Sequence, residues 1–267
     1  MRISVVGIGK AGSLLAKFFY RKGYSVSHLI NRTPEQALKL AHELPGCKAG
    51  GFELLAELED VVIIATSDSA IRDTFLRIWN VNTRPEYFIH LSGAISSRVF
   101  EEAAKAEKGV ASFHPNLSIS SFSISPSLLQ KAIFGLEGNE KGIAFLASIA
   151  KKEGLRYVNI STESKILYHA AAVFSSNFTQ LMLKQAESLY REKLLFDNLS
   201  VVELLESYLE GLLKKVKTGT LSEFSGPAAR NDQRTLELEQ RCLSEINPKL
   251  GKLYEELSCM IRHVRGD

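Results

Sequence analysis

The chain of 267 residues carries a formal net charge of +3, and 45% of its residues are hydrophobic and 24% charged. This composition is typical of a globular protein with a packed core, and the length suits one large or two modest domains. The small charge, without a long basic run, argues against a nucleic-acid partner, and no apolar stretch reaches the roughly 18 residues of a membrane helix.

The N-terminus and the cysteines indicate a cytoplasmic protein. The first apolar run starts at Ile3, directly after Met1 and Arg2, which leaves no room for a signal peptide. The 3 cysteines are scattered and form no C-x-x-C pair, so neither a disulfide framework nor a metal site is expected. We expect them to be small buried apolar residues, and they are Cys47, Cys242 and Cys259.

Short apolar runs alternate with amphipathic segments over residues 1–160. The predicted strands are 2–6, 24–30, 61–65, 87–91, 110–113, 132–136 and 156–160. The predicted helices are 10–22, 34–44, 69–79 and 142–152. Thr33 is the expected N-cap of the second helix, with Pro34 at its first position. Strands alternating with helices predict βαβ units with right-handed crossovers, and hence an α/β domain with a mostly parallel, Rossmann-type sheet.

The pattern changes near Ser161, after which only helical periodicity is found. The predicted helices are 162–191, 199–216, 230–246 and 248–262. We therefore expect an α/β domain over residues 1–160 and an all-α domain over residues 161–267. The helical domain carries many apolar residues, more than one small domain is expected to bury, which predicts a homodimer formed through it.

A glycine motif lies between the first predicted strand and helix, and its sequence is Gly7-Ile8-Gly9-Lys10-Ala11-Gly12. This G-x-G-x-x-G pattern in a strand–turn–helix context predicts a dinucleotide site. Gly7 permits the tight turn, Gly9 lets the backbone approach the pyrophosphate, and Gly12 lets the helix pack on the sheet. The helix N-terminus offers free N–H groups to the phosphates.

The end of the second predicted strand favours NADPH over NADH. An NAD enzyme usually has an acidic residue there, to bind the ribose 2′-hydroxyl. This chain has Asn31-Arg32-Thr33 and no acid before Glu35. Arg32 has the planar donors that suit a 2′-phosphate, and Asn31 and Thr33 add neutral donors.

Thr66-Ser67-Asp68 follows the third predicted strand. Ligands of open parallel sheets bind beyond the carboxyl ends of the strands, so Thr66 and Ser67 are expected to contact the cofactor. Asp68 is open to two interpretations, as the N-cap of the next helix, which we favour, or as a cofactor contact.

Two further strand ends carry polar groups that suit a substrate site. Ser92, followed by Gly93, is expected to contact the substrate or the nicotinamide. His114 is held extended by Pro115, and it either hydrogen-bonds its own loop or contacts the substrate. His90 lies within a strand and is expected to be a buried histidine with satisfied hydrogen bonds.

The long predicted helix carries four polar residues on an otherwise apolar surface, and they are Lys165, His169, Ser176 and Asn177. Lys165 and His169 are neighbours on one face, Ser176 lies about two turns further on, and Asn177 is reachable from the margin of that stripe. We expect this face to contact the substrate. The alternatives are a surface charge for Lys165, a core position for His169 and a helix-packing hydrogen bond for Asn177.

A loop between two later helices holds Arg230 and Asp232 after Gly226-Pro227. Arg230 could grip a carboxylate with two hydrogen bonds or lie in a dimer interface. Asp232 falls in the first turn of a helix, where an acidic residue is favoured, and it is expected to cap the helix or orient Arg230.

Together these motifs resemble one group of enzymes. The matching segments are Gly7–Gly12, His90–Gly93, His114-Pro115, Tyr168–Ala172 with Asn177, and Gly226-Pro227 with Arg230 and Asp232. The chain resembles pyrroline-5-carboxylate reductase, ketopantoate reductase and the β-hydroxyacid dehydrogenases. It resembles more closely a family whose Rossmann domain precedes a domain of unknown function, some members of which look like an alternative class of ketopantoate reductase.

The resemblance implies NADPH-dependent reduction of a small 2-oxo acid, ketopantoate to pantoate, in pantothenate synthesis. It implies a helical domain similar to the C-terminal domain of 6-phosphogluconate dehydrogenase. Lys165 matches the lysine that begins the interdomain helix of β-hydroxyacid dehydrogenases, while His169 stands where they have asparagine. We expect Lys165 to donate the proton and His169 and Asn177 to orient the carbonyl. The alternatives are an imine reductase and a non-catalytic NADP-binding sensor or scaffold.

Overall fold

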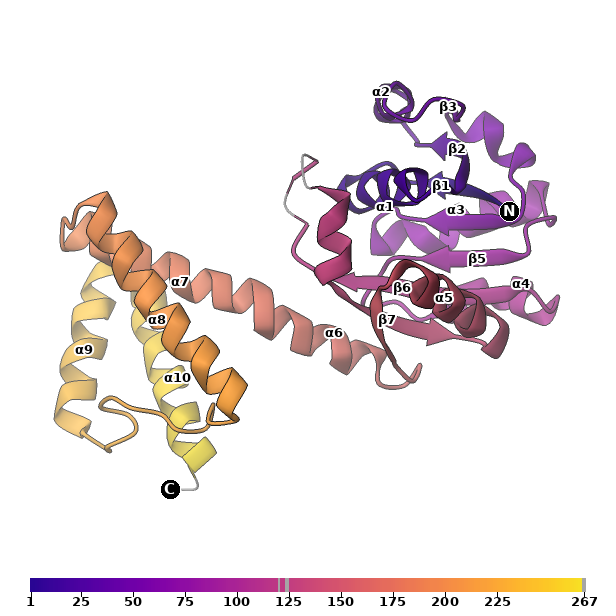
Figure 1. Cartoon of the computed structure of the whole chain (residues 1–267). Helices are drawn as coiled ribbons and strands as arrows, with labels where there is room; N and C mark the ends of the chain where they lie inside the picture. The colour runs from indigo at the N-terminus through magenta and orange to yellow at the C-terminus, as the bar shows by residue number, and fades with distance from the viewer. Residues whose placement is uncertain (120, 123–124, 266–267) are drawn as a thin grey trace. The chain divides into compact units, whose positions relative to one another are not determined.

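The computed structural model describes residues 1–119, 121–122 and 125–265, and the chain divides into two compact units, Met1–Gln180 and Leu181–Asp267. The first unit contains a sheet with helices, and in Figure 1 the second contains helices alone. The division comes later than the change of pattern near Ser161, because Lys165, in the first turn of the helix that follows, hydrogen-bonds to the sheet.

Eight strands form the sheet, in the order β3-β2-β1-β4-β5-β6-β7-β8. They are β1 (Arg2–Val6), β2 (Ser25–Ile30), β3 (Lys48–Gly50), β4 (Val61–Ile64), β5 (Tyr87–His90), β6 (Gly109–Asn116), β7 (Ile133–Gly138) and β8 (Arg156–Asn159). Only the β6–β7 pairing is antiparallel among those described. The predicted mostly parallel sheet is therefore confirmed.

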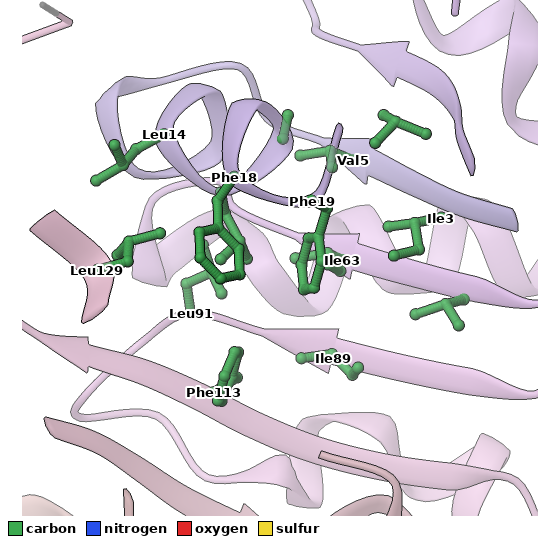
Figure 2. Packing of buried hydrophobic residues seen from close by; sticks show 14 of the residues in the cluster. Ile3, Val5, Leu14, Phe18, Phe19, Ile63, Ile89, Leu91, Phe113 and Leu129 are labelled. Atoms are coloured by element: carbon green, nitrogen blue, oxygen red, sulfur yellow. The ribbon is translucent and has the colours of Figure 1, made fainter. Parts of the chain in front are cut away.

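Helices cover both faces of the sheet. They are α1 (Lys10–Arg21), α2 (Glu35–Ala41), α3 (Asp68–Val81), α4 (Glu101–Lys105) and α5 (Glu140–Glu153), with 3₁₀ turns η1 (Phe52–Glu57), η2 (Ser97–Phe100) and η3 (Pro126–Lys131). The first apolar cluster joins α1 and α5 to one face, and the second joins α3 and α4 to the other. Figure 2 shows Phe18 and Phe19 of α1 directed at Ile63 and Ile89 in the strands. This packing holds the carboxyl ends of the strands at one edge.

The long predicted helix over residues 162–191 is interrupted twice by π-helical turns. Its segments are α6 (Lys165–Val173), the π turn η4 (Phe174–Phe178), α7 (Thr179–Ser188) and the π turn η5 (Leu189–Lys193). In the first of these turns, Thr179 Oγ1 donates a hydrogen bond of 2.9 Å to the Phe174 carbonyl oxygen, five residues back. The prediction of one regular helix was therefore wrong here. The difference matters for function, because π turns occur often at functional sites.

The second unit contains α8 (Asn198–Thr218), α9 (Gln233–Ile246) and α10 (Pro248–Arg265). Asp197 caps α8 by accepting hydrogen bonds from the Leu199 and Ser200 backbone N–H groups. The last two helices pack together, and Gln240 donates a hydrogen bond to Glu255 between them. Among the described residues, no helix is both long and apolar enough to cross a membrane.

Two predictions about single residues are wrong. Cys242, on α9, is exposed, and Cys259, on α10, is half-buried. Cys47 is half-buried just before β3 and packs against the first apolar cluster. Thr33 does not cap the second helix, which begins at Glu35 after Pro34. The Thr33 carbonyl instead accepts a hydrogen bond of 3.0 Å from Asn31 Nδ2, which fixes the loop between β2 and α2.

Candidate functional site

The glycine loop after β1 has the geometry that a close ligand requires. Gly7 has φ +101°, and a Cβ there would lie 2.6 Å from the Ala65 backbone carbonyl carbon. A Cβ on Gly12 would overlap the Gly7 carbonyl oxygen, so glycine is needed where α1 packs on the loop. A Cβ on Gly9 would meet no atom within 4 Å, so this residue faces open space.

A first cavity, with a volume of about 290 Å³, opens beside this loop at the carboxyl ends of β1, β2 and β4. Its lining includes most of the predicted cofactor residues, and these are Gly7, Gly9, Asn31, Arg32, Thr33, Thr66 and Ser67. Thr66 Oγ1 is buried and has no hydrogen-bond partner in the described part of the chain. Arg32 is exposed, and no described carboxylate lies within ion-pair distance of it. Both side chains are therefore free to bind a ligand.

Asn31 and the remaining residues of the glycine loop have structural roles at this cavity. Asn31 Oδ1 accepts a hydrogen bond of 3.2 Å from the Ile8 N–H, so this amide ties the glycine loop to the end of β2. The Ile8 side chain is 2% exposed and belongs to the core. The residues Lys10 and Ala11 form the first turn of α1.

Asp68 does not cap α3 as we favoured. Ser67 occupies the N-cap position, and Asp68 is the first residue of the helix, with no side-chain capping bond. An acidic residue in the first turn still interacts favourably with the helix dipole. Its charge also partly opposes the lowering of the Lys165 pKa by burial.

A second cavity of about 520 Å³ lies between the end of β6 and the face of α6 and η4. It brings together four of the predicted residues, which are His114, His169, Ser176 and Asn177. Because β6 runs parallel to β5 and, through it, to β4 and β1, both cavities lie at the carboxyl edge of the sheet. That edge is where open α/β sheets bind their ligands.

The two imidazoles of this cavity converge on Gly93. Their ring centroids are 5.8 Å apart, and a Cβ on Gly93 would lie 2.5 Å from His169 Nδ1 and 2.8 Å from His114 Nε2. Burial, together with the charges of the neighbouring Lys165 and His169, lowers the pKa of His114 to about 4. His114 is therefore neutral at physiological pH. His169 Nδ1 is buried and has no described hydrogen-bond partner.

Lys165 lies behind these imidazoles rather than in the lining of either cavity. Its side chain is 1% exposed, and Nζ donates a hydrogen bond of 2.7 Å to Ser112 Oγ. Ser112 Oγ in turn donates to the Ser92 carbonyl oxygen at 2.9 Å. Burial lowers the pKa of Lys165 to about 8, against the opposing effect of Glu137, whose Oε2 lies 3.9 Å from Nζ.

Glu137 completes this buried network. Its carboxylate is fully buried and accepts hydrogen bonds from the Ser97 N–H, from Ser97 Oγ and from Thr162 Oγ1, each of 2.9 Å. It therefore fixes the segment after β5 to the segment that enters α6. Sequence reasoning missed Glu137, although an acidic residue inside the apolar strand β7 is the signal that could have identified it.

Ser92 shapes its own loop. Its Oγ accepts hydrogen bonds from the Ala94 and Ile95 N–H groups, at 3.1 and 2.9 Å, and its side chain lines neither cavity. His90 is fully buried, and Nδ1 accepts a hydrogen bond from the Ser92 N–H. Burial, reinforced by Lys165, lowers the pKa of His90 to about 3, so it stays neutral and structural.

Ser176 and Asn177 belong to the π turn η4 and face the second cavity. Ser176 Oγ lies 2.8 Å from both the Ala172 carbonyl oxygen and Asn177 Oδ1, so its single proton serves one of them at a time. The wider turn changes the angles that a regular helix would give these residues. The Asn177 side chain remains exposed and able to reorient toward a ligand.

Arg230 and Asp232 belong to the second compact unit and are described within it. Asp232 is the N-cap of α9, because its carboxylate accepts hydrogen bonds from Thr235 N and Thr235 Oγ1 at 3.2 and 2.7 Å. These bonds, and the charge of Arg230, lower its pKa. The predicted capping role of Asp232 is confirmed, and Arg230 is exposed.

Comparison with known families matches both parts of the chain. Residues 132–261 match a domain of unknown function, DUF2520, and residues 1–90 match the shikimate / quinate 5-dehydrogenase family. A curated glutamyl-tRNA reductase from Methanoculleus marisnigri is 33% identical over 122 residues. The aligned part covers 42% of this chain and only 28% of that enzyme, so the likeness extends to about a quarter of its length.

Solved structures match almost the whole chain. A protein from Thermotoga maritima has a TM-score of 0.71 and 26% identity, with 98% of this chain and 97% of that chain covered. A protein from Bacteroides fragilis assigned as an NADP oxidoreductase has a TM-score of 0.78 and 26% identity, with 98% of each chain covered.

An imine reductase from Myxococcus stipitatus, solved in complex with NADP⁺, has a TM-score of 0.61 and 16% identity, with 100% of this chain and 93% of that chain covered. At this identity the likeness concerns the fold alone. The chain thus has the Rossmann-like fold of the NADP oxidoreductases, and its residues 132–261, from β7 through most of the helical region, are similar to DUF2520.

Proposed function

We propose that the protein reduces a small 2-oxo acid with NADPH, and that 2-dehydropantoate (ketopantoate), reduced to pantoate, is the first substrate to test. The pair of cavities at one edge of the sheet carries this proposal. The first adjoins the glycine loop and Arg32, and the second adjoins the imidazoles of His114 and His169. A cofactor that extends from the first cavity toward the second would bring its reactive end beside groups that bind and protonate a carbonyl.

The residues of the first cavity fit NADPH. Gly7 and Gly12 form a cradle that a Cβ would fill, and Thr66 Oγ1 has no partner among the described residues. Free N–H groups at the start of α1 suit the pyrophosphate, and the guanidinium of Arg32 suits the 2′-phosphate. When bound, NADPH supplies the hydride for the carbonyl carbon.

His169 is the proton donor in this proposal, and Asn177 orients the carbonyl. A proton donor must first reach the reacting oxygen, and only then does its pKa matter. His169 lines the second cavity, whereas the ammonium of Lys165, the donor expected from the sequence, is 1% exposed and bonded to Ser112. We therefore assign Lys165 a positioning role, in which it holds the Ser92–Gly93 loop through Ser112.

One observation favours an imine as an alternative substrate. Within the described part of the chain, the lining of the second cavity contains no lysine or arginine to hold the carboxylate of a 2-oxo acid. Arg230, which the sequence suggested for that role, is not among the residues that line this cavity. An imine without a carboxylate would need no such cation, whereas pyrroline-5-carboxylate carries a carboxylate as ketopantoate does.

The test is NADPH oxidation by the purified protein with ketopantoate or with pyrroline-5-carboxylate, and with NADH as the control cofactor. Turnover of ketopantoate with NADPH is the expected result. Turnover of pyrroline-5-carboxylate alone would show that the substrate is an imine and not a 2-oxo acid. Tight NADPH binding without turnover of either compound would exclude ketopantoate as the substrate and favour another 2-oxo acid or a non-catalytic NADP-binding sensor.

A further inference from the structure

The hydroxyl of Tyr168, on α6, lies 3.2 Å from His114 Nδ1, on β6. The two rings meet edge to face, with centroids 5.7 Å apart and an interplanar angle of 90°. Gly135 on β7 makes room for this contact, because a Cβ there would lie 2.7 Å from the Tyr168 hydroxyl oxygen. Together, α6, β6 and β7 therefore place the Tyr168 phenol beside Nδ1 of the His114 ring.

The direction of this hydrogen bond follows from counting donors and acceptors. Burial raises the pKa of Tyr168, so its hydroxyl keeps its proton at physiological pH. Among the described residues, His114 Nδ1 is the only hydrogen-bond partner of that hydroxyl. If Nδ1 carried the ring proton instead, the phenolic proton would have no protein acceptor, which is costly for a half-buried group. The favoured arrangement has Tyr168 donating and Nδ1 accepting.

We infer that Tyr168 is a positioning residue that holds His114 in the tautomer with its proton on Nε2. That nitrogen lies beside Gly93, where the second cavity begins. His114 then presents a neutral N–H donor to the carbonyl oxygen of a bound substrate, while His169 supplies the proton. The inference about His114 as a substrate contact rests on the proposed function, but the tautomer itself does not.

A neutral donor is favoured because of the charges that surround the ring. The titratable groups that act on His114 are Lys165, His169, His90 and Tyr168. The positive charge of Lys165 opposes a second proton on His114, so the ring remains a hydrogen-bond donor and not an acid. A fixed N–H donor stabilises negative charge that develops on a reacting oxygen without exchanging a proton with it.

The first test is ¹⁵N NMR of the histidine rings in the full chain without substrate. The His114 signals are identified by their loss in His114→Gln. We expect an unprotonated Nδ1 and a protonated Nε2 in the wild type, and a mixture of tautomers in Tyr168→Phe. Tyr157→Phe, on the edge strand β8, is the matched control and should leave the His114 signals unchanged. A protonated Nδ1 in the wild type would overturn the inference, even if Tyr168→Phe failed to fold.

Kinetics provide the second test. With the substrate found in the turnover assay, Tyr168→Phe should lower kcat about 10-fold through loss of a fixed donor. The affinity for NADPH should stay within about a factor of two, because Tyr168 does not line the first cavity. Unchanged kcat together with a mixed tautomer would show that His114 does not act on the substrate. Because the NMR readout needs no substrate, failure of the proposed function and failure of the tautomer assignment are distinguishable.

Discussion

Gly93 lies where the imidazoles of His114 and His169 converge, and the gap between them is too small for a side chain. A methyl group at this position would lie within 2.8 Å of both rings. The rings sit on β6 and α6, so they cannot both move away without disturbing the packing of these elements. A side chain at Gly93 would therefore displace two residues that line the second cavity.

We predict that Gly93→Ala lowers kcat about 100-fold, because a displacement of about 1 Å at reacting groups costs this much. NADPH binding, measured by fluorescence titration, should change little, since the first cavity is lined by other residues. Gly211→Ala is the matched control, because a Cβ there meets nothing within 4 Å. Equal turnover in Gly93→Ala and wild type would contradict the assignment of the second cavity.

Arg32 carries the proposed discrimination between NADPH and NADH. Replacing it with serine should weaken NADPH binding about 10- to 100-fold, as expected for loss of hydrogen bonds to a charged group, and should leave NADH binding nearly unchanged. Arg21→Ser, at the exposed end of α1, controls for the loss of one positive charge. Equal weakening for both cofactors would show that Arg32 does not contact the 2′-phosphate.

Lys165 shows what sequence alone could not supply at this scale. The spacing of four residues on a helix correctly placed Lys165 beside His169. It gave no sign that Lys165 is buried, because a lysine at the start of a helix is usually solvated. Its hydrogen-bond partner, Ser112, is 53 residues away in sequence, and its neighbour Glu137 comes from another strand. Contacts between distant segments are not encoded in local periodicity, so the burial of Lys165 could not be read from its surroundings in the chain.

At the scale of elements, the buried network ties β6 to the loop after β5 and to α6. Ser112 connects Lys165 of α6 with the Ser92 carbonyl. Glu137 of β7 connects Ser97, after β5, with Thr162, before α6. Removal of one member leaves buried polar groups without partners. The network therefore stabilises the edge of the sheet on which the second cavity lies.

Ser112→Ala should lower the free energy of unfolding by about 1–3 kcal/mol, the range for a buried donor left without its acceptor. Urea denaturation measures this loss. Ser148→Ala, on the exposed face of α5, is the control and should change stability by less than about 0.5 kcal/mol. If the two variants are equally stable, the network does not hold the site.

Periodicity identified the long elements and missed the short ones. Helices such as α3 are long enough for their apolar pattern to be recognised, and β4, although it has only 4 residues, is a continuous apolar run. β3 has 3 residues, and the 3₁₀ turns η1 and η2 follow no amphipathic repeat, so they left no signal. The π turn η4 was missed because the sequence around it keeps ordinary helical periodicity.

At the scale of the whole molecule, the predicted fold class is confirmed, while the second unit leaves much apolar surface uncovered. Exposed side chains on and beside α8 include Leu195, Leu199, Tyr208, Leu213 and Val216, each at least 52% exposed. A surface of this kind is typical of a protein interface. The predicted homodimer through the helical region remains a prediction that this exposure supports.

We predict a solution mass of twice 29.6 kDa, measured by size-exclusion chromatography with light scattering. Leu213→Glu should shift the protein toward the monomer, because it introduces a charge into the apolar surface of α8. Leu38→Glu, at a position 49% exposed on α2, is the matched control and should leave the mass unchanged. A wild-type monomer at micromolar concentration would contradict the prediction.

In the proposed reaction, hydride passes from NADPH in the first cavity to a carbonyl carbon held in the second. This transfer is measured by supplying ketopantoate and NADPH that carries deuterium at both C4 positions of the nicotinamide, and by analysing the product by mass spectrometry. We expect pantoate with one deuterium on its new C–H carbon, formed about 100-fold more slowly by His169→Gln. Bound NADPH without labelled pantoate, or equal rates in both proteins, would contradict the proposed reaction.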